Sequence, residues 1–341
     1  METRIIRVDF HTHIIPEALP NFIEKYGDPR WPVLEKTCSC GANIVMEGKN
    51  FREVTDQVWS PTRRIEDMDK EGVDIQVLSP IPLMFSYWAD VDQATEMSRI
   101  QNDFIANIVR DYPSRFIGLG TVPMQGAEAA IKEMERCVKE LGLKGIEIGT
   151  NVNGENLDHP SFAPFFEKAA EWDVPLFIHP WESLGLDRMQ RHNFMYTISY
   201  PSDTALAAAS LIKGAVLAKY PNLKICLAHG GGSFPYLLSR LEQGWNVWPH
   251  LREIEKPPSY YAKKLYFDSL IYDPHNLHFL IERFGYDKIL MGSDYPFLLR
   301  EINPGKVVDD AAAALSDEVK RAILGANALN FLNVDIKEVT S

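Results

Sequence analysis

Short apolar runs alternate with longer amphipathic stretches along most of this chain. Eight apolar runs read as buried strands, at residues 5–10, 73–79, 116–121, 145–149, 175–179, 224–228, 265–268 and 289–292. Stretches with helical periodicity lie between most of them, at residues 62–71, 92–111, 127–141, 162–172, 202–219 and 275–284. The repeated strand–helix order predicts an α/β fold with a parallel sheet and right-handed crossovers. Eight such units favour a closed (β/α)8 barrel of the TIM type over an open doubly wound sheet.

Residues 14–60 interrupt this rhythm between the first strand and its helix. Three short stretches between turn-forming residues are expected to be antiparallel strands: 33–35, 43–47 and 51–55. The segment is too short and too poor in apolar residues to fold independently. We therefore expect residues 1–341 to form one barrel domain, with this small β-rich insertion covering the C-terminal mouth of the barrel. Residues 315–332 are expected to form an outer helix, followed by a frayed polar tail.

Composition narrows the class of protein. The 341 residues are 45% hydrophobic and 24% charged, which is typical of a soluble globular protein. The formal charge of −12 argues against nucleic acid or an anionic membrane as a partner. No apolar run is long enough to span a bilayer, and the N-terminus lacks a secretory apolar region. Four cysteines are too few for a disulfide framework in a chain of this length, so a cytoplasmic location is expected.

Two histidines follow the first apolar run, in Val8-Asp9-Phe10-His11-Thr12-His13. Because side chains alternate between the two faces of a strand, both imidazoles are expected on the same face. Neighbouring imidazoles at a strand end are a typical beginning of a divalent metal site. On this motif alone, a polar strand end with two solvated histidines remains an alternative.

Later strands end in matching residues. His179, His229 and Asp294 each follow an apolar run, where an ionisable group without a partner is costly to bury. Barrel enzymes build their active sites at the C-terminal ends of the strands, so these side chains are expected to meet. Four histidines and one aspartate suit zinc or a similar divalent ion.

One histidine is expected to remain free of the metal and to move protons, since imidazole titrates near neutral pH. We expect this residue to be His229, because the glycines of Gly230-Gly231-Gly232 leave room for a ligand against the backbone. The alternative is that His229 is a core histidine that caps the next helix.

The combined motifs resemble those of the amidohydrolase-superfamily decarboxylases. They comprise the His-x-His pair, His179-Pro180-Trp181, His229-Gly230-Gly231-Gly232, Gly292-Ser293-Asp294-Tyr295-Pro296-Phe297, Gly48-Lys49-Asn50-Phe51-Arg52 and Arg64-Ile65-Glu66-Asp67-Met68-Asp69. The resemblance therefore covers nearly the whole chain. It implies a barrel with one zinc ion held by His11, His13, His179 and Asp294, although another divalent transition metal is possible. It also implies that His229 is the acid/base next to the metal, with Asp294 sharing in proton transfer.

The resemblance further implies that Arg52 and Arg240 bind the carboxylates of a small-molecule substrate, and that Lys49 matches a pocket lysine of the family. An arginine fork suits a carboxylate better than a lysine does. Arg240 is implied to reach the site from the neighbouring subunit of a homodimer. It lies three helical turns beyond His229, which is roughly 16 Å along a helix, so a role in the neighbour's site is sterically sensible. Without the resemblance, both arginines would read as solvated charges.

Several residues depart from the family pattern and leave the substrate open. His192 and Tyr196 stand where the family carries tryptophans, and Leu298-Leu299-Arg300 replaces Pro-Leu-Gly. Arg300 could pair with an extra carboxylate near the mouth or lie on the surface. Cys38 and Cys40 could form half of a second metal site, but two thiols without a second pair are more often reduced cysteines.

These observations predict a zinc-dependent, non-oxidative decarboxylase of a small unsaturated or aromatic carboxylic acid. No organic cofactor is expected, because the chain lacks a dinucleotide-binding or Walker motif. Three alternatives remain: a hydrolase of the same superfamily acting on a lactone or amide, a catalytically inactive barrel that binds a metal or ligand, and a barrel with structural histidines and another active pocket.

Overall fold

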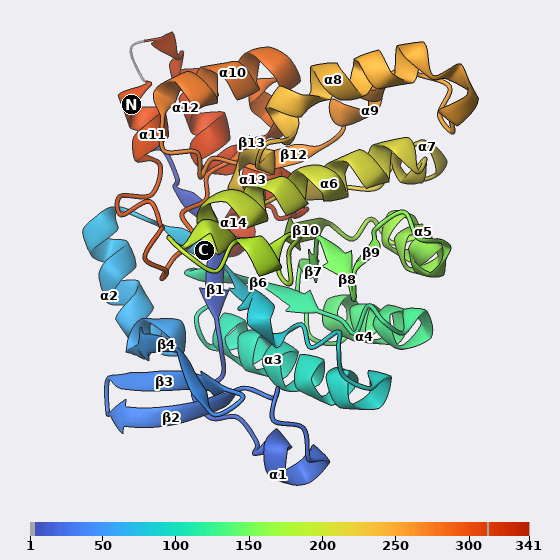
Figure 1. Cartoon of the computed structure of the whole chain (residues 1–341). Coiled ribbons are helices and arrows are strands. Elements are labelled where there is room, and N and C mark those ends of the chain that lie inside the picture. The colour runs from blue at the N-terminus through green and yellow to red at the C-terminus, as the bar shows by residue number, and fades with distance from the viewer. Residues whose placement is uncertain (1–3, 312–313, 341) are drawn as a thin grey trace.

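Eight parallel strands form a single sheet that curls into a barrel, with helices around the outside (Figure 1). The computed structural model describes residues 4–311 and 314–340. The strands follow one another around the barrel as β1 (Val8–Ile14), β5 (Ile75–Pro80), β6 (Phe116–Thr121), β7 (Gly145–Gly149), β10 (Leu176–His179), β11 (Ile225–Leu227), β12 (Tyr266–Asp268) and β13 (Ile289–Leu290). The predicted (β/α)8 fold is confirmed.

Hydrogen bonds between β1 and the segment that begins with β13 close the ring. The Phe10 amide donates to the Met291 carbonyl at 2.8 Å, and the Asp294 amide donates to the His11 carbonyl at 2.8 Å. The second of these bonds ties the two chain segments together where the candidate metal ligands lie.

Helices on the outer face cover the strands. They include α2 (Pro61–Glu71), α3 (Val91–Asp111), α4 (Ala127–Lys139), α5 (Ala163–Glu171), α6 (Tyr200–Lys213), α7 (Val216–Lys219), α8 (Phe234–Val247), α9 (Pro258–Ala262), α10 (Pro274–Phe284) and α11 (Lys306–Asp310). Local sequence explains the ends of α2: the Ser60 hydroxyl accepts a hydrogen bond from the Arg63 amide, and Gly72 ends the helix in a left-handed conformation. The helix predicted over 202–219 is divided in two, because Ala215 adopts a φ of 61°.

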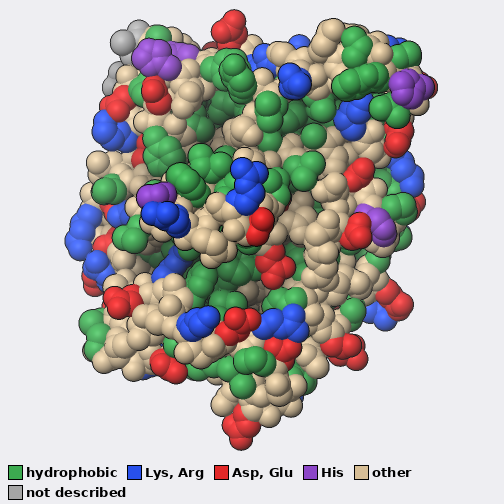
Figure 2. All heavy atoms as spheres, viewed as in Figure 1, with side chains coloured by type: hydrophobic (Ala, Val, Ile, Leu, Met, Phe, Trp, Pro, Cys, Tyr) green, Lys and Arg blue, Asp and Glu red, His purple; other side chains and the backbone are tan. Residues whose placement is uncertain are grey.

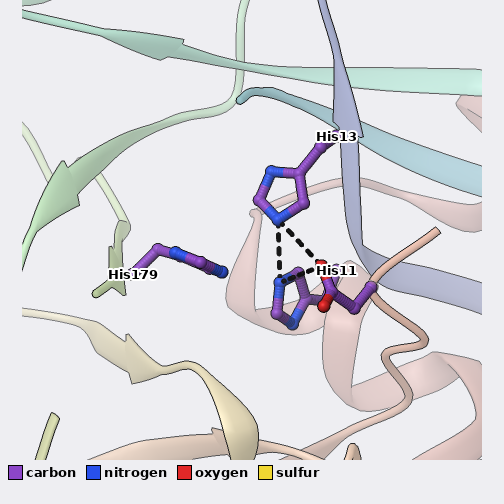
Figure 3. Close-up of side chains that lie close together, drawn as sticks. His11, His13 and His179 are labelled. Carbon is purple, nitrogen blue, oxygen red and sulfur yellow. Dashed lines mark hydrogen bonds and ion pairs between the residues drawn. The ribbon is translucent and has the colours of Figure 1, made fainter. Parts of the chain in front are cut away.

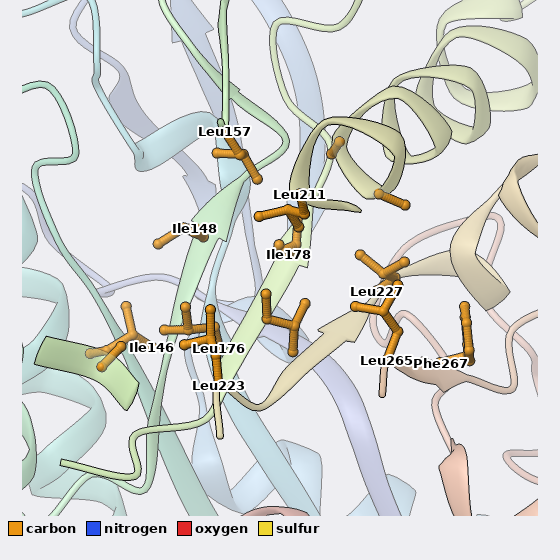
Figure 4. Packing of buried hydrophobic residues seen from close by; sticks show 14 of the residues in the cluster. Ile146, Ile148, Leu157, Leu176, Ile178, Leu211, Leu223, Leu227, Leu265 and Phe267 are labelled. Atoms are coloured by element: carbon orange, nitrogen blue, oxygen red, sulfur yellow. The ribbon is translucent and has the colours of Figure 1, made fainter. Parts of the chain in front are cut away.

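Two apolar cores lie on the two sides of the barrel wall. Leu176 and Ile178 of β10 point outward into the layer between strands and helices, together with Leu211 of α6 (Figure 4). Phe177, between them in sequence, points inward and meets the Phe10 ring with centroids 5.1 Å apart. This alternation places His179 on the inward face of β10.

The C-terminal segment closes the inner core. The predicted helix over 315–332 is formed by α12 (Asp317–Arg321), a π-helical segment (Ala322–Ala326) and α13 (Asn327–Phe331). The expectation of a frayed tail beyond residue 332 is wrong, because residues Ile336–Thr340 form α14. Val339 is buried in the inner cluster with Phe331, so apolar burial stabilises this short helix.

The insertion holds α1 (Phe22–Tyr26) and an antiparallel sheet of β2 (Val33–Cys38), β3 (Gly41–Met46) and β4 (Lys49–Thr55), at the bottom of Figure 1. The three predicted strands are confirmed and are longer than expected, whereas α1 was not predicted. The insertion shares an apolar cluster with Ile81, which follows β5, and Phe51 lies 6.0 Å from the Trp181 ring, which follows β10. A small antiparallel pair, β8 (Asn151–Val152) and β9 (Glu155–Asn156), follows β7.

The surface charge and the length of the helices relate to the expectation that the protein binds neither nucleic acid nor a membrane. Acidic and basic side chains are interspersed over the face seen in Figure 2. Within residues 4–311 and 314–340, no helix has the length and apolar character needed to cross a membrane.

Replacing Arg64 with methionine is expected to lower the free energy of unfolding by about 3 kcal/mol, because a buried acceptor loses its charged donor. The Arg64 side chain is fully buried, and its two terminal nitrogens donate to the His13 carbonyl at 2.6 and 3.1 Å. Urea unfolding measures the change. The neighbouring variant Arg63→Met removes a partly exposed cation and should cost less than about 1 kcal/mol; equal losses in both variants would contradict the assigned role of Arg64.

Candidate metal centre

The strand that carries His11 and His13 is irregular at that point. Asp9 pairs with Gln76 and Thr12 pairs with Leu78, so β1 holds one residue more than β5 between these pairs. Such a bulge changes which way the following side chains point. Phe10 therefore fills the inner core, while His11 and His13 both join His179 and Asp294 in a group of possible metal ligands, the metal group. The expectation of simple alternation at a strand end does not describe this stretch, because His11 and His13 lie inside β1 rather than at its end.

Three histidines and one aspartate converge inside the barrel. One possible ligand atom from each of His11, His13, His179 and Asp294 lies within 4.8 Å of the others, and all four residues are buried. Figure 3 shows the three imidazoles directed toward a common point. The Nε2 atoms of His11 and His13 are 3.0 Å apart, and Asp294 Oδ1 lies 3.2 Å from His13 Nε2. The four predicted ligands are therefore brought together.

The remaining ring nitrogens of these histidines are occupied by the protein. His11 Nδ1 donates to Asp268 Oδ2 at 2.6 Å, and His13 Nδ1 donates to the Pro80 carbonyl at 2.9 Å. His179 Nδ1 donates to the Pro180 carbonyl at 3.0 Å. Such contacts fix the tautomer that presents Nε2 to a metal.

Two of the atoms that face the common point have no hydrogen-bond partner among the described residues. His179 Nε2 and Asp294 Oδ1 are buried and form no hydrogen bond among the described residues. A buried polar atom without a partner is costly, and a divalent ion would satisfy both atoms. The donor set fits such an ion because nitrogen and carboxylate oxygen ligands suit zinc and neighbouring transition metals.

Electrostatics favour the protonation states that a metal requires at three of the four candidate ligands. Burial holds the pKa of His179 well below its ordinary value and also lowers the pKa of His13. Burial alone would raise the pKa of Asp294, but its contact with His13 and the neighbouring His11 hold it below the ordinary value. Neutral imidazoles and an ionised carboxylate are the forms that bind metal.

His229 lies beside the metal group without belonging to it. Its ring centroid is 4.9 Å from that of His179 and 5.3 Å from that of His11, and its Nδ1 atom is buried without a hydrogen-bond partner. Burial lowers its pKa to about 4. His229 follows β11 in a short 3-10 turn and adopts a φ of 57°, in the left-handed region. This position suits a group that exchanges protons with a molecule bound next to the metal.

The expectation that Gly230-Gly231-Gly232 makes space beside His229 is wrong. The three glycines after it were expected to leave room for a ligand, but protein atoms fill that space. A Cβ atom on Gly230 would lie 2.3 Å from Ile271, and one on Gly232 would lie 2.1 Å from the Pro201 carbonyl oxygen. These glycines serve a tight turn with positive φ angles, and the turn positions His229.

Three buried acids around the site were not predicted. Asp268, at the end of β12, accepts hydrogen bonds from His11 Nδ1 and from the His229 and Gly230 amides. Asp9 accepts from the Ser293 amide at 2.9 Å, next to Asp294, and burial raises its pKa to about 7. Glu147 of β7 lies 3.8 Å from His13 Nδ1, and burial raises its pKa well above the ordinary range. Asp268 ends a strand as the ligands do, so the same pattern could have identified it.

Replacing Asp268 with asparagine is expected to weaken metal binding by roughly 10- to 100-fold, as for other residues that orient metal ligands. The amide would face His11 Nδ1 with a donor, which disfavours the tautomer that presents Nε2. Competition against a chelator measures the affinity. The control is Asp273→Asn, at an exposed helix cap in the following loop; a similar loss there, or none in Asp268→Asn, would refute the orienting role.

Arg52 lies at the mouth and carries an uncompensated charge. Its guanidinium donates to the Tyr196 hydroxyl at 2.8 Å and lies over the Phe297 ring at 4.4 Å. The Phe297 ring in turn lies 5.3 Å from the His13 ring. Among the described residues, Arg52 contacts the Tyr196 hydroxyl and the rings of Phe51, Tyr196 and Phe297, and none of these groups is a carboxylate. A cation held by rings beside a metal group is suited to an anionic ligand.

Arg240 and Lys49 are not brought to the metal group within one chain. Arg240 is exposed on the outer helix α8, and Lys49 is exposed at the start of β4. Neither side chain contacts the four candidate ligands.

The departures from the family pattern have different consequences. Tyr196 supports Arg52 at the mouth, whereas His192 and Leu298 are exposed. Arg300 is half-buried and pairs with Glu71 at the end of α2, at 2.7 Å. Its partner is therefore a carboxylate of the protein.

Comparisons with known proteins agree with this geometry. A model of the amidohydrolase family matches residues 8–334. The chain is 45% identical to 2-amino-3-carboxymuconate-6-semialdehyde decarboxylase of Dictyostelium discoideum, over 97% of this chain and 93% of that protein. It is 32% identical to the Caenorhabditis elegans protein of the same name, over 96% of this chain and 94% of that protein.

Solved structures show the same fold. Apo IDCase of Metarhizium anisopliae matches with a TM-score of 0.84 at 22% identity, covering 98% of both chains. A dihydroxybenzoic acid decarboxylase of Polaromonas sp. JS666, solved with bound manganese, matches with a TM-score of 0.76 at 24% identity, covering 99% of this chain and 100% of that chain. The protein is an enzyme, a carboxy-lyase, and it belongs to the amidohydrolase family.

Proposed function

We propose that this enzyme is a zinc-dependent decarboxylase that acts without an oxidant on 2-amino-3-carboxymuconate 6-semialdehyde or a close analogue. The observation that carries the proposal is the group of three histidines and one aspartate, with His229 beside it and Arg52 at its mouth. The 45% identity to a decarboxylase of this substrate supports the choice of acid.

A metal ion would be held by His11, His13, His179 and Asp294. When bound, it would neutralise negative charge on substrate oxygens and lower the pKa of a coordinated water molecule. Zinc is favoured by the predominance of imidazole donors. The manganese found in the Polaromonas relative makes that metal the alternative, and metal analysis of protein purified without added metal decides between them.

The protein's own groups supply binding and proton transfer. Arg52, which has no acidic partner in the part of the chain that the structure describes, would bind a substrate carboxylate through two parallel hydrogen bonds. His229 would take up a proton from water and donate it to the carbon that loses CO2, and Asp294 would share in this transfer. The family resemblance supports Lys49, at the exposed start of β4, as a further substrate-binding cation.

We also propose that the enzyme is a homodimer in which Arg240 completes the neighbour's site. The helix that carries Arg240 and the segment after it expose large apolar side chains, at Tyr236, Leu237, Val247, Trp248 and Leu251. An apolar patch of this kind is typical of a protein interface. In a two-fold dimer each chain would give Arg240 to the other.

Mixing two inactive variants tests the shared site. His179→Ala and Arg240→Ala should each be inactive or nearly so as pure proteins. Mixed dimers would hold one intact site of two, so a fully exchanged mixture should recover roughly a quarter of wild-type activity. A mixture of His11→Ala with His179→Ala is the control and should recover none. Absence of recovery in the first mixture, after exchange is verified, would refute the shared site.

The decarboxylase itself is tested by measuring CO2 release from 2-amino-3-carboxymuconate 6-semialdehyde and from a panel of hydroxybenzoates. We expect CO2 release from the semialdehyde without uptake of water. Uptake of water without CO2 release, from these acids or from a lactone or amide, would favour the hydrolase alternative.

We also propose that residues 1–341 form one domain, because residues far apart in the chain close the same barrel. The free thiols and the net charge of −12 support a cytoplasmic location and a small-molecule partner, with no role for nucleic acid or a membrane.

A further inference from the structure

The turn between β2 and β3 carries two neighbouring thiols that the proposed reaction does not use. Cys38 ends β2 and Cys40 follows Ser39, and both side chains are exposed. Their sulfur atoms lie 3.1 Å apart. The other two cysteines, Cys137 and Cys226, are buried.

The backbone around the turn holds the two sulfur atoms together. The pairing of β2 with β3 shifts between Lys36 and Cys38, and Cys38 pairs with Gly41. A Cβ atom on Gly41 would lie 3.2 Å from Cys38 Sγ, so a larger residue there would crowd this sulfur. The Cys40 carbonyl accepts a hydrogen bond from the Asp56 amide at 3.0 Å, which anchors the turn to the segment after β4.

The same pair is poorly suited to a metal ion. A structural zinc site needs four ligands. Within the part of the chain that the structure describes, no third histidine, cysteine or carboxylate joins Cys38 and Cys40 in a potential metal group. The geometry therefore favours chemistry between the two sulfur atoms.

We propose that Cys38 and Cys40 form a redox modification site, where a low-molecular-weight disulfide such as oxidised glutathione converts the exposed dithiol into an intramolecular disulfide. The Cys38 thiolate attacks one sulfur of the small disulfide, forms a mixed disulfide and releases one reduced thiol. Cys40 then loses its proton and attacks Cys38 Sγ, which releases the second reduced thiol. The protein loses two hydrogen atoms, and the small disulfide gains them.

Electrostatics agree with this order of attack. The hydrogen bond with Cys40 lowers the pKa of Cys38, and the same contact raises the pKa of Cys40. Burial raises the pKa of Cys137 and of Cys226 well above the ordinary range. Because the thiolate is the nucleophile, Cys38 should react first and the two buried thiols should not react.

The test incubates the folded full-length protein with oxidised glutathione near neutral pH, quenches it with acid and measures its intact mass. We expect the wild type to lose the mass of two hydrogen atoms, and peptide mapping to join Cys38 to Cys40 within one chain. Cys40→Ser should stop at the first step and retain one glutathionyl group on Cys38. Cys38→Ser should acquire a glutathionyl group several-fold more slowly than Cys40→Ser does.

Three results would overturn the proposal: a wild-type protein that stays reduced, one that accumulates a stable glutathionyl adduct, or a disulfide that joins two chains. Cys137 and Cys226 serve as internal controls, since they should remain free until the protein is denatured. Both substitutions lie on an exposed turn, so folding of the variants can be verified by thermal melting before treatment.

Discussion

Replacing His179 with alanine is expected to remove the bound metal and to lower kcat by roughly 10³- to 10⁴-fold, which corresponds to the several kcal/mol of charge stabilisation that a metal ion supplies. His179 Nε2 is a ligand atom of the candidate group and has no hydrogen-bond partner among the described residues. Its loss leaves two imidazoles and one carboxylate, which bind a divalent ion more weakly. Metal analysis of the purified variant and a CO2-release assay measure the two effects.

The matched control is His192→Ala, because His192 is exposed on the loop after β10. This variant should keep its metal and its activity. A His179→Ala protein with a full complement of metal and wild-type turnover would show that the reaction takes place elsewhere. A second check is the wild type stripped by a chelator, which should lose activity and regain it when zinc is restored.

Much of the barrel could be predicted because its strands are buried on both faces. Such strands read as continuous apolar runs, and β6 and β7 begin and end where the pattern indicated. Short elements could not be predicted in this way. Helix α1 is a single turn that is held by tertiary contact, with the Phe22 ring 4.8 Å from the Trp31 ring. An isolated helix of this length is unstable, so its sequence carries little signal.

The candidate metal group could be predicted because each of its residues lies at or near the end of an apolar run. His179 shows the rule at its simplest, since the alternation along β10 directs it inward with Phe177. The bulge in β1 could not be predicted, because it depends on how β1 pairs with β5. Sequence spacing therefore indicated that His11 and His13 join the candidate metal group, while giving an incomplete account of their geometry.

Contacts between side chains that are far apart in the sequence were the least predictable feature. Arg300 and Glu71 are far apart in the chain, and only the fold brings them together at 2.7 Å. Tyr196 and Arg52 are also far apart in the chain, and only the fold brings them within 2.8 Å. The glycines after His229 were interpreted as space for a ligand, but neighbouring side chains and backbone occupy that space. A glycine motif alone does not distinguish a binding loop from a tightly packed turn.

Replacing His229 with asparagine is expected to lower kcat by roughly 10²- to 10⁴-fold, the usual contribution of a general acid or base, while metal content stays at the wild-type level. Asparagine tolerates the left-handed backbone that His229 adopts. The substitution also leaves the backbone amide that donates to Asp268 in place. The turn should therefore persist, and the loss can be attributed to the imidazole. Metal analysis and single-turnover CO2 release measure the two quantities separately.

Comparing His229→Asn with His179→Ala distinguishes a metal ligand from a residue that only lies beside the metal. His229 lies outside the group of four candidate ligands, although its ring is only 4.9 Å from that of His179. If His229→Asn lost metal as His179→Ala should, His229 would be a ligand and another group would have to move the proton. His275→Asn makes the same substitution at an exposed helix start and should change neither quantity. Loss of turnover with metal retained, confined to His229→Asn, is the result that assigns proton transfer to this imidazole.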